Sequence, residues 1–142
     1  MTDETPGSAG AWRKARKFLL TTLVAAAVGG FIWNQLPSGA YPTDLSRIGS
    51  GRPAVVLAQD GNYVGGTAVM ELLNAIRGDY AERIDFLVAP LALADAREFA
   101  GRHAATDGTV LLFDASGRRV RLLHQPQSTD ELRQALAQAF GL

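Results

Sequence analysis

The fold is decided by the stretch Pro53-Ala54-Val55-Val56-Leu57-Ala58, a continuous apolar run that is rich in β-branched residues and too short for a helix. Such a run is typical of a parallel strand that is covered on both faces. Residues 59–66 contain three glycines and end the run, and residues 84–89 form a second apolar run before Pro90. Between them, apolar residues recur at the spacing of one helix face: Val69, Leu72, Leu73, Ile76 and Tyr80. The order strand, helix, strand predicts a parallel pair with a right-handed crossover.

The rest of the chain adds a helix, a hairpin and a closing helix. Small and apolar residues from Leu93 to Ala104 predict the second helix. Residues 109–113 and 120–123 read as strands, and Gly117 in the turn between them can supply the positive φ of a hairpin. The sequence Ser128-Thr129-Asp130-Glu131 is a capping box, which predicts a final helix with Ser128 as its N-cap.

A basic block precedes a long uncharged segment near the N-terminus. Arg13, Lys14, Arg16 and Lys17 lie directly before residues 18–36, which carry no charge and approach the roughly 20 residues that a helix needs to cross a bilayer. We therefore predict one N-terminal transmembrane helix over 18–36. The positive-inside rule places residues 1–17 in the cytoplasm. Residues 37–52 are then a linker, and residues 53–142 form a domain in the periplasm of a bacterial inner membrane.

Two alternatives concern this N-terminal segment. The small residues before Tyr41 also fit cleavage of a secretory signal after Ala40, which would release a soluble binding protein. If the helix is kept, small residues on two neighbouring stripes would let it pack closely on another span, although a simple anchor also tolerates them. The predicted packing residues are Thr22, Ala25, Ala26, Gly29 and Gly30.

Composition narrows the chemistry of the outer domain. The chain has no cysteine, so it can form no disulfide, perform no thiol chemistry and carry no cysteine-linked lipid. Its two histidines, His103 and His124, lie far apart without a partner at metal-ligand spacing, so we expect no metal and no cofactor. Residues 34–142 hold ten Arg, no Lys and twelve acidic residues. This balance does not favour nucleic-acid binding, which needs a coherent basic face.

The element order β-α-β-α-β-β-α, with a glycine-rich loop after the first strand, resembles the thioredoxin fold without its additional N-terminal strand and helix. The stretch from Asp107 to Val120 resembles the corresponding part of membrane-anchored thioredoxin-like proteins of the TlpA and ResA type. The resemblance covers about residues 53–140. It implies an α/β three-layer sandwich around a mixed four-stranded sheet, and it says little about function because one fold serves many functions.

The sequence departs from this family at both parts of its redox site. The two redox cysteines would fall in the loop Asp60 to Gly66, where neither is present. The family's cis-proline aligns with Gly108, in front of Thr109. Thiol–disulfide exchange needs a thiolate, so this activity is carried over to no residue and we expect a protein that is not an enzyme.

A docking surface is the site that the sequence favours. An aromatic and an aliphatic residue at a loop tip are suited to insertion into a partner, and the fold places this loop beside the former cis-proline position. Glycines before the helix could instead cradle an anion or simply permit a tight turn. The predicted partner-binding residues are Asn62, Tyr63, Val64, Gly65, Asp107, Gly108 and Thr109.

These features predict an accessory or assembly subunit of a larger membrane protein complex. Its expected partners are the subunits of that complex and the lipid bilayer, without nucleic acid or a small-molecule substrate. The alternative is a periplasmic redox or chaperone helper that presents peptide clients to a separate thiol–disulfide oxidoreductase.

Overall fold

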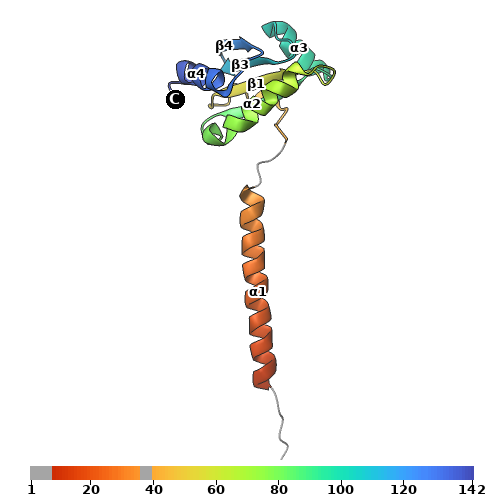
Figure 1. Ribbon diagram of the computed structural model, residues 1–142, viewed down its shortest axis with the longest axis vertical. Helices are drawn as coiled ribbons and strands as arrows, with labels where there is room; N and C mark the ends of the chain where they lie inside the picture. Colours follow the sequence, from red (N-terminus) through yellow and green to blue (C-terminus); the bar gives the residue numbers. More distant parts are fainter. Residues whose placement is uncertain (1–7, 36–39) are drawn as a thin grey trace, which may run out of the picture. The chain divides into compact units, whose positions relative to one another are not determined.

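The computed structural model describes residues 8–35 and 40–142 (Figure 1). The chain divides into two compact units, residues 1–40 and 41–142, and each is described by itself. The second unit is the folded domain that carries the sheet.

The domain holds four strands and three α-helices in the predicted order. The elements are β1 (Ala54–Gln59), α2 (Gly65–Tyr80), β2 (Asp85–Pro90), α3 (Ala94–His103), β3 (Thr109–Phe113), β4 (Arg119–His124) and α4 (Thr129–Phe140). The sheet order is β2-β1-β3-β4, in which β1 is parallel to β2 and β3 is antiparallel to both of its neighbours. The prediction of an α/β fold around a mixed four-stranded sheet is confirmed.

The alternation of side chains along the central strands separates two apolar clusters. Val55 and Leu57 of β1 face the cluster formed with α2 and α4, whereas Val56 and Ala58 face the cluster formed with α3. All four side chains are almost completely buried. The sheet therefore lies between α2 and α4 on one face and α3 on the other, which is the three-layer arrangement expected from a strand covered on both sides (Figure 1).

The first turn of α4 confirms the predicted N-cap. The Ser128 hydroxyl accepts a hydrogen bond from the backbone N–H of Glu131 at 3.2 Å. Glu131 reaches back one residue further than the motif predicts, because its carboxylate accepts from the backbone N–H of Gln127 at 2.9 Å. The first contact satisfies a backbone donor that the first turn of a helix leaves unpaired, and the second fixes the residue before the N-cap to that turn.

The folded domain begins at Tyr41, earlier than the predicted boundary at residue 53. Tyr41 is 8% exposed, and its hydroxyl donates a hydrogen bond to Asn74 Oδ1 of α2 at 2.7 Å. The Arg77 guanidinium lies 4.3 Å from the centre of the tyrosine ring. The Pro42 carbonyl accepts from the backbone N–H of Val88 in the edge strand β2 at 3.0 Å. The predicted linker thus belongs to the folded domain from Tyr41 onward, because the Tyr41 side chain is buried against α2.

A short 3₁₀ helix, η1 (Leu45–Arg47), continues this N-terminal segment on the opposite side of the sheet. The Asp44 carboxylate caps it by accepting from the backbone N–H of Ser46 at 3.1 Å. Leu45 and Ile48 are partly buried against the cluster that includes α3. The remaining residues of the predicted linker, 37–39, lie outside the described residues.

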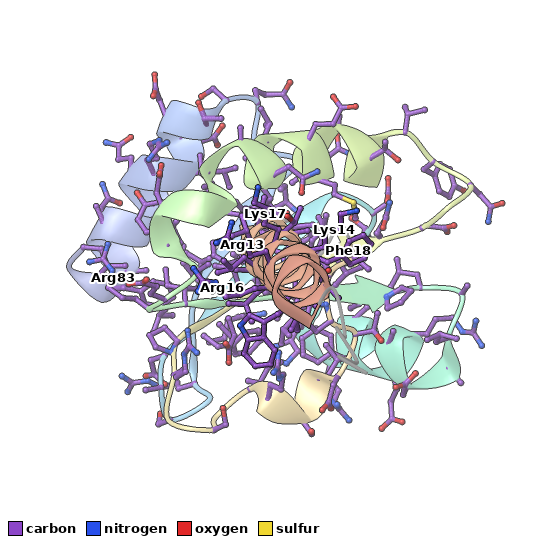
Figure 2. The ribbon with its side chains drawn as sticks, turned by 90° about the horizontal axis from the view of Figure 1, so that it is seen from below. Arg13, Lys14, Arg16, Lys17, Phe18 and Arg83 are labelled. Atoms are coloured by element: carbon purple, nitrogen blue, oxygen red, sulfur yellow. The ribbon has the colours of Figure 1, made fainter. Side chains whose placement is uncertain are left out.

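The N-terminal unit contains one helix, α1 (Ser8–Gln35). Figure 2 looks along this helix and shows the exposed side chains of Arg13, Lys14, Arg16 and Lys17 extending from it. Within residues 8–35 and 40–142, no helix has a stretch that is both long and apolar enough to cross a membrane, which differs from the prediction for residues 18–36.

The predicted packing residues of α1 that are described, Thr22 to Gly30, are exposed along the helix. The hydroxyls of Thr21 and Thr22 each donate to the carbonyl oxygen four residues earlier, at 2.8 Å. Both threonine hydroxyls therefore have a hydrogen-bond acceptor within α1 and need none from a neighbouring helix.

Candidate functional site: a groove at the start of helix α2

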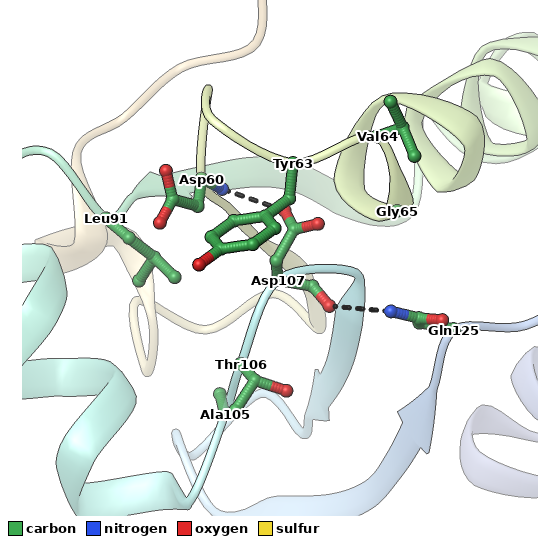
Figure 3. Close-up of a pocket in the computed structure, with 9 residues that line it drawn as sticks. All are labelled: Asp60, Tyr63, Val64, Gly65, Leu91, Ala105, Thr106, Asp107 and Gln125. Atoms are coloured by element: carbon green, nitrogen blue, oxygen red, sulfur yellow. Dashed lines mark hydrogen bonds between the residues drawn. The ribbon is translucent and has the colours of Figure 1, made fainter.

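A groove of about 600 Å³ opens at one edge of the sheet, beside the first turn of α2 (Figure 3). Two apolar side chains stand out at its margin, since Tyr63 is 64% exposed and Val64 is 86% exposed. The groove is formed by the loops after β1 and β2, the segment before β3 and the residue after β4. Its lining residues are Asp60, Tyr63, Val64, Gly65, Leu91, Ala105, Thr106, Asp107 and Gln125.

The carboxylate of Asp107 ties the β1–α2 loop to the segment before β3. One oxygen accepts from the backbone N–H of Asp60 and the other from the backbone N–H of Gly66, both at 2.8 Å. Gly66 lies in the first turn of α2, and Val64, the residue that precedes the helix, has no side-chain cap. Asp107 therefore provides the negative partner that the positive end of α2 favours.

This contact bears on the idea that the loop glycines cradle an external anion. The backbone N–H of Gly66 already donates to Asp107, which belongs to the same chain. A Cβ added to Gly66 would collide with Asp107 Oδ1 and would lie 2.9 Å from Cγ of Gln59. The absence of a side chain at Gly66 thus makes room for an internal carboxylate at this helix end.

Gly108 joins three segments. Its backbone N–H donates to the Ala58 carbonyl at 2.9 Å, and its carbonyl accepts from the Gln125 N–H at 3.1 Å. Its φ of +81° lies in the region that favours glycine, and an added Cβ would approach Gln125 Cγ to 2.8 Å. No peptide bond among the described residues is cis. The backbone at Gly108 is therefore trans and left-handed.

Asp60 shapes the tip of the exposed loop. Its Oδ1 accepts from both the backbone N–H and the side-chain amide of Asn62, at 3.0 and 2.9 Å. Its carbonyl accepts from the backbone N–H of Tyr63 at 3.1 Å. These bonds form a tight turn in which Asp60 and Tyr63 lie on the groove side, close to Leu91 (Figure 3).

The structure brings four of the seven predicted partner-binding residues into the groove lining, namely Tyr63, Val64, Gly65 and Asp107. Asn62 is exposed beside the groove. Gly108 is buried. Thr109 is fully buried, and its hydroxyl accepts from the backbone N–H of Thr106 at 3.0 Å, so it supports the segment that forms the groove wall.

Sequence reasoning did not assign five of the lining residues to the site: Asp60, Leu91, Ala105, Thr106 and Gln125. The predicted topology contained the signal that could have found them. The carboxyl ends of β1, β2 and β4 and the amino end of β3 meet at one sheet edge, and these residues follow or precede those strand ends.

A second, smaller cavity of about 290 Å³ lies on the α3 side of the domain, and Leu45, Phe99, His103 and Phe113 are among its lining residues. The His103 ring packs against Phe99 and Phe113, with ring centres 4.7 and 5.3 Å away. Burial lowers the pKa of His103, and the nearby charges of Arg119 and Arg102 lower it further. This imidazole is therefore held preferentially in its neutral form.

The sequence matches no family model and no curated protein. Among solved structures, the chain is similar to an uncharacterized thioredoxin-like protein from Clostridium perfringens, with a TM-score of 0.62. The two share 12% sequence identity, and the similarity covers 69% of this chain and 79% of the other. The likeness shows a thioredoxin-like fold and, at this identity, the fold alone.

Proposed function

We propose that this protein is a non-catalytic accessory or assembly subunit of a larger membrane complex, and that its thioredoxin-like domain docks onto other subunits through the groove. The observation that supports this proposal is the exposure of Tyr63 and Val64 at the margin of a preformed groove. Solvent-exposed apolar side chains beside a concave surface are typical of protein interaction sites.

The chemistry of the groove also favours binding over catalysis. In the redox family, the loop after the first strand carries the reactive thiols, and in this cysteine-free chain it carries Asp60, Tyr63 and Val64. The carboxylate of Asp107 is engaged by two backbone N–H groups. Its charge is committed to positioning the loop and the first turn of α2, which makes Asp107 a structural residue in this proposal.

Membrane attachment is the second part of the proposal, and it rests on the sequence of the N-terminal segment. Four basic residues followed by the uncharged segment 18–36 favour a span with its N-terminus in the cytoplasm and the domain in the periplasm of a bacterial inner membrane. The small residues from Thr22 to Gly30 would be the face that packs on a partner span. Resistance to alkaline carbonate extraction, with protease sensitivity of the domain in spheroplasts, tests this part directly.

Affinity purification of the full-length protein from native membranes in a mild detergent tests the docking function. We expect a stoichiometric partner to co-purify with the wild type, and we expect Tyr63→Ala combined with Val64→Ala to lose it. Val120→Ser is the matched control, because Val120 is an exposed aliphatic residue on β4 that does not line the groove. Recovery of the wild type as a lone monomer would contradict the proposal.

A helper that presents peptide clients to a separate oxidoreductase is the second candidate. It is favoured by the polar and apolar groups that four chain segments place around one open groove. This candidate predicts transient capture of unfolded or oxidised periplasmic peptides, whereas an assembly subunit predicts one stable partner.

A further inference from the structure

We infer that the groove selects a basic segment of its partner, with an arginine or lysine side chain placed between the Asp60 carboxylate and the Tyr63 ring. This inference rests on the proposed docking function and specifies the chemistry of the partner. It is based on the charge of the groove, the hydrogen bonding of its two carboxylates and the exposure of its aromatic ring.

The charges that line the groove have one sign. Asp60 and Asp107 are the ionisable carboxylates among its lining residues, and no Lys, Arg or His lines it within the described part of the chain. The two carboxylates differ in their bonding. Both oxygens of Asp107 accept backbone hydrogen bonds, whereas Asp60 accepts from Asn62 through Oδ1 alone among the residues that the structure describes. The second oxygen of Asp60 is therefore available for a cation that enters the groove.

Tyr63 offers a cation the face of an exposed aromatic ring beside that carboxylate (Figure 3). In the folded domain, the rings of the other two tyrosines already have arginine guanidinium groups near their faces. Arg77 lies 4.3 Å from the ring centre of Tyr41, and Arg83 and Arg133 lie 5.9 and 5.8 Å from that of Tyr80. Within residues 8–35 and 40–142, Tyr63 has no such cation. Its ring is thus the tyrosine face left for a cation from another protein.

The remaining lining residues suit the rest of a basic side chain. Leu91 and Ala105 provide apolar surface for the aliphatic stem of arginine or lysine, whose charged head stays near the groove mouth. The guanidinium of Arg97 donates to the carbonyl oxygens of Leu91 and Ala92, at 3.3 and 2.9 Å. This neighbouring cation is held by backbone carbonyls, and no ion pair joins it to Asp60 among the described residues.

Binding of two labelled peptides to the full-length protein in a neutral detergent tests the inference by fluorescence anisotropy. One peptide alternates valine with arginine, and the other alternates valine with glutamate. We expect the arginine peptide to bind more tightly and to weaken as salt is added. Asp60→Asn keeps the acceptor for Asn62 while removing the charge, and it should weaken the arginine peptide about fivefold. Tyr63→Leu, which keeps an apolar side chain, should weaken it about threefold.

Asp130→Asn is the matched control, because it removes the same charge from an exposed residue in the first turn of α4. This variant should bind like the wild type, which excludes an effect of net charge. Equal binding of the two peptides, or wild-type affinity in Asp60→Asn, overturns the inference. The docking function still stands in that case if co-purification of the native partner depends on Tyr63 and Val64. If the native partner co-purifies equally well with the variant that lacks both side chains, the docking function itself is refuted.

Discussion

The backbone N–H of Gly66 donates a 2.8 Å hydrogen bond to the carboxylate of Asp107, a residue 41 positions later in the chain. This bond connects the first turn of α2 to the segment before β3, and the same carboxylate also holds the backbone of Asp60. Asp107 therefore joins the β1–α2 loop and the first turn of α2 to the segment before β3.

Asp107→Ala should lower the free energy of unfolding by about 1–3 kcal/mol, because it leaves two partly buried backbone N–H groups without their acceptor. Gly66→Ala should have an effect of similar size, since its new methyl group occupies the position of the carboxylate. Urea unfolding monitored by circular dichroism measures both. Thr67→Ala, at the next and exposed position of α2, should change stability by less than about 0.5 kcal/mol. Equal stability of all three variants would refute the structural role of Asp107.

A fragment that begins at Tyr41 should fold, and a fragment that begins at residue 53 should be less stable by several kcal/mol. The shorter fragment lacks the buried Tyr41 side chain, whose loss alone is comparable to deleting a large core residue, at about 3–5 kcal/mol. Thermal unfolding of the two purified fragments measures the difference. Tyr41→Phe in the longer fragment keeps the buried ring and removes the hydroxyl, which donates to Asn74 and interacts with Arg77, and it should cost about 0.5–1.5 kcal/mol.

The domain should lose stability as the pH falls below the ordinary histidine pKa of 6.5. Burial, with Arg119 and Arg102 nearby, lowers the pKa of His103 in the folded state. The unfolded chain consequently takes up a proton at a pH where the folded chain does not, so the stabilising contribution is present above 6.5 and is lost as the pH falls toward the folded-state pKa.

Urea midpoints measured between pH 7.5 and pH 5 test this expectation. His103→Gln should flatten the decline, because glutamine does not titrate, whereas His124→Gln should retain it. An unchanged slope in His103→Gln would show that the decline has another origin.

Ser128→Ala should lower the free energy of unfolding by about 1 kcal/mol, the usual effect of removing a helix N-cap. Asp130→Ala removes an exposed acidic side chain from the same turn without removing the cap, and we expect a smaller loss of a few tenths of a kcal/mol. Chemical unfolding of the two variants under one set of conditions distinguishes the cap from the helix-dipole effect.

The strand and helix order of this domain could be predicted from local signals. The apolar run at Val55 and Val56, the turn ending at Gly117 and the cap at Ser128 each specify their own neighbourhood, and the structure confirms all three. Contacts between residues far apart were harder to predict. Tyr41 looked like part of a linker because its binding site on α2 lies 33 positions away, and nothing in the local pattern around it indicates burial.

The same limit applies to the candidate site. The loop tip at Tyr63 could be predicted because an aromatic residue between glycines is conspicuous. The role of Asp107 could not, since an aspartate before a glycine has the same appearance in an ordinary turn. Its carboxylate acquires a specific partner only when the β1–α2 loop and the segment before β3 are brought together by the sheet.

The contact between Tyr41 and α2 gives the domain a mechanical property. Tyr41 is the first residue of the folded domain, and it holds the middle of α2 through Asn74 and Arg77. The opposite end of that helix supplies Gly65 to the groove. A pulling force applied to the chain before Tyr41 would therefore act on α2, the helix whose first residue lines the groove.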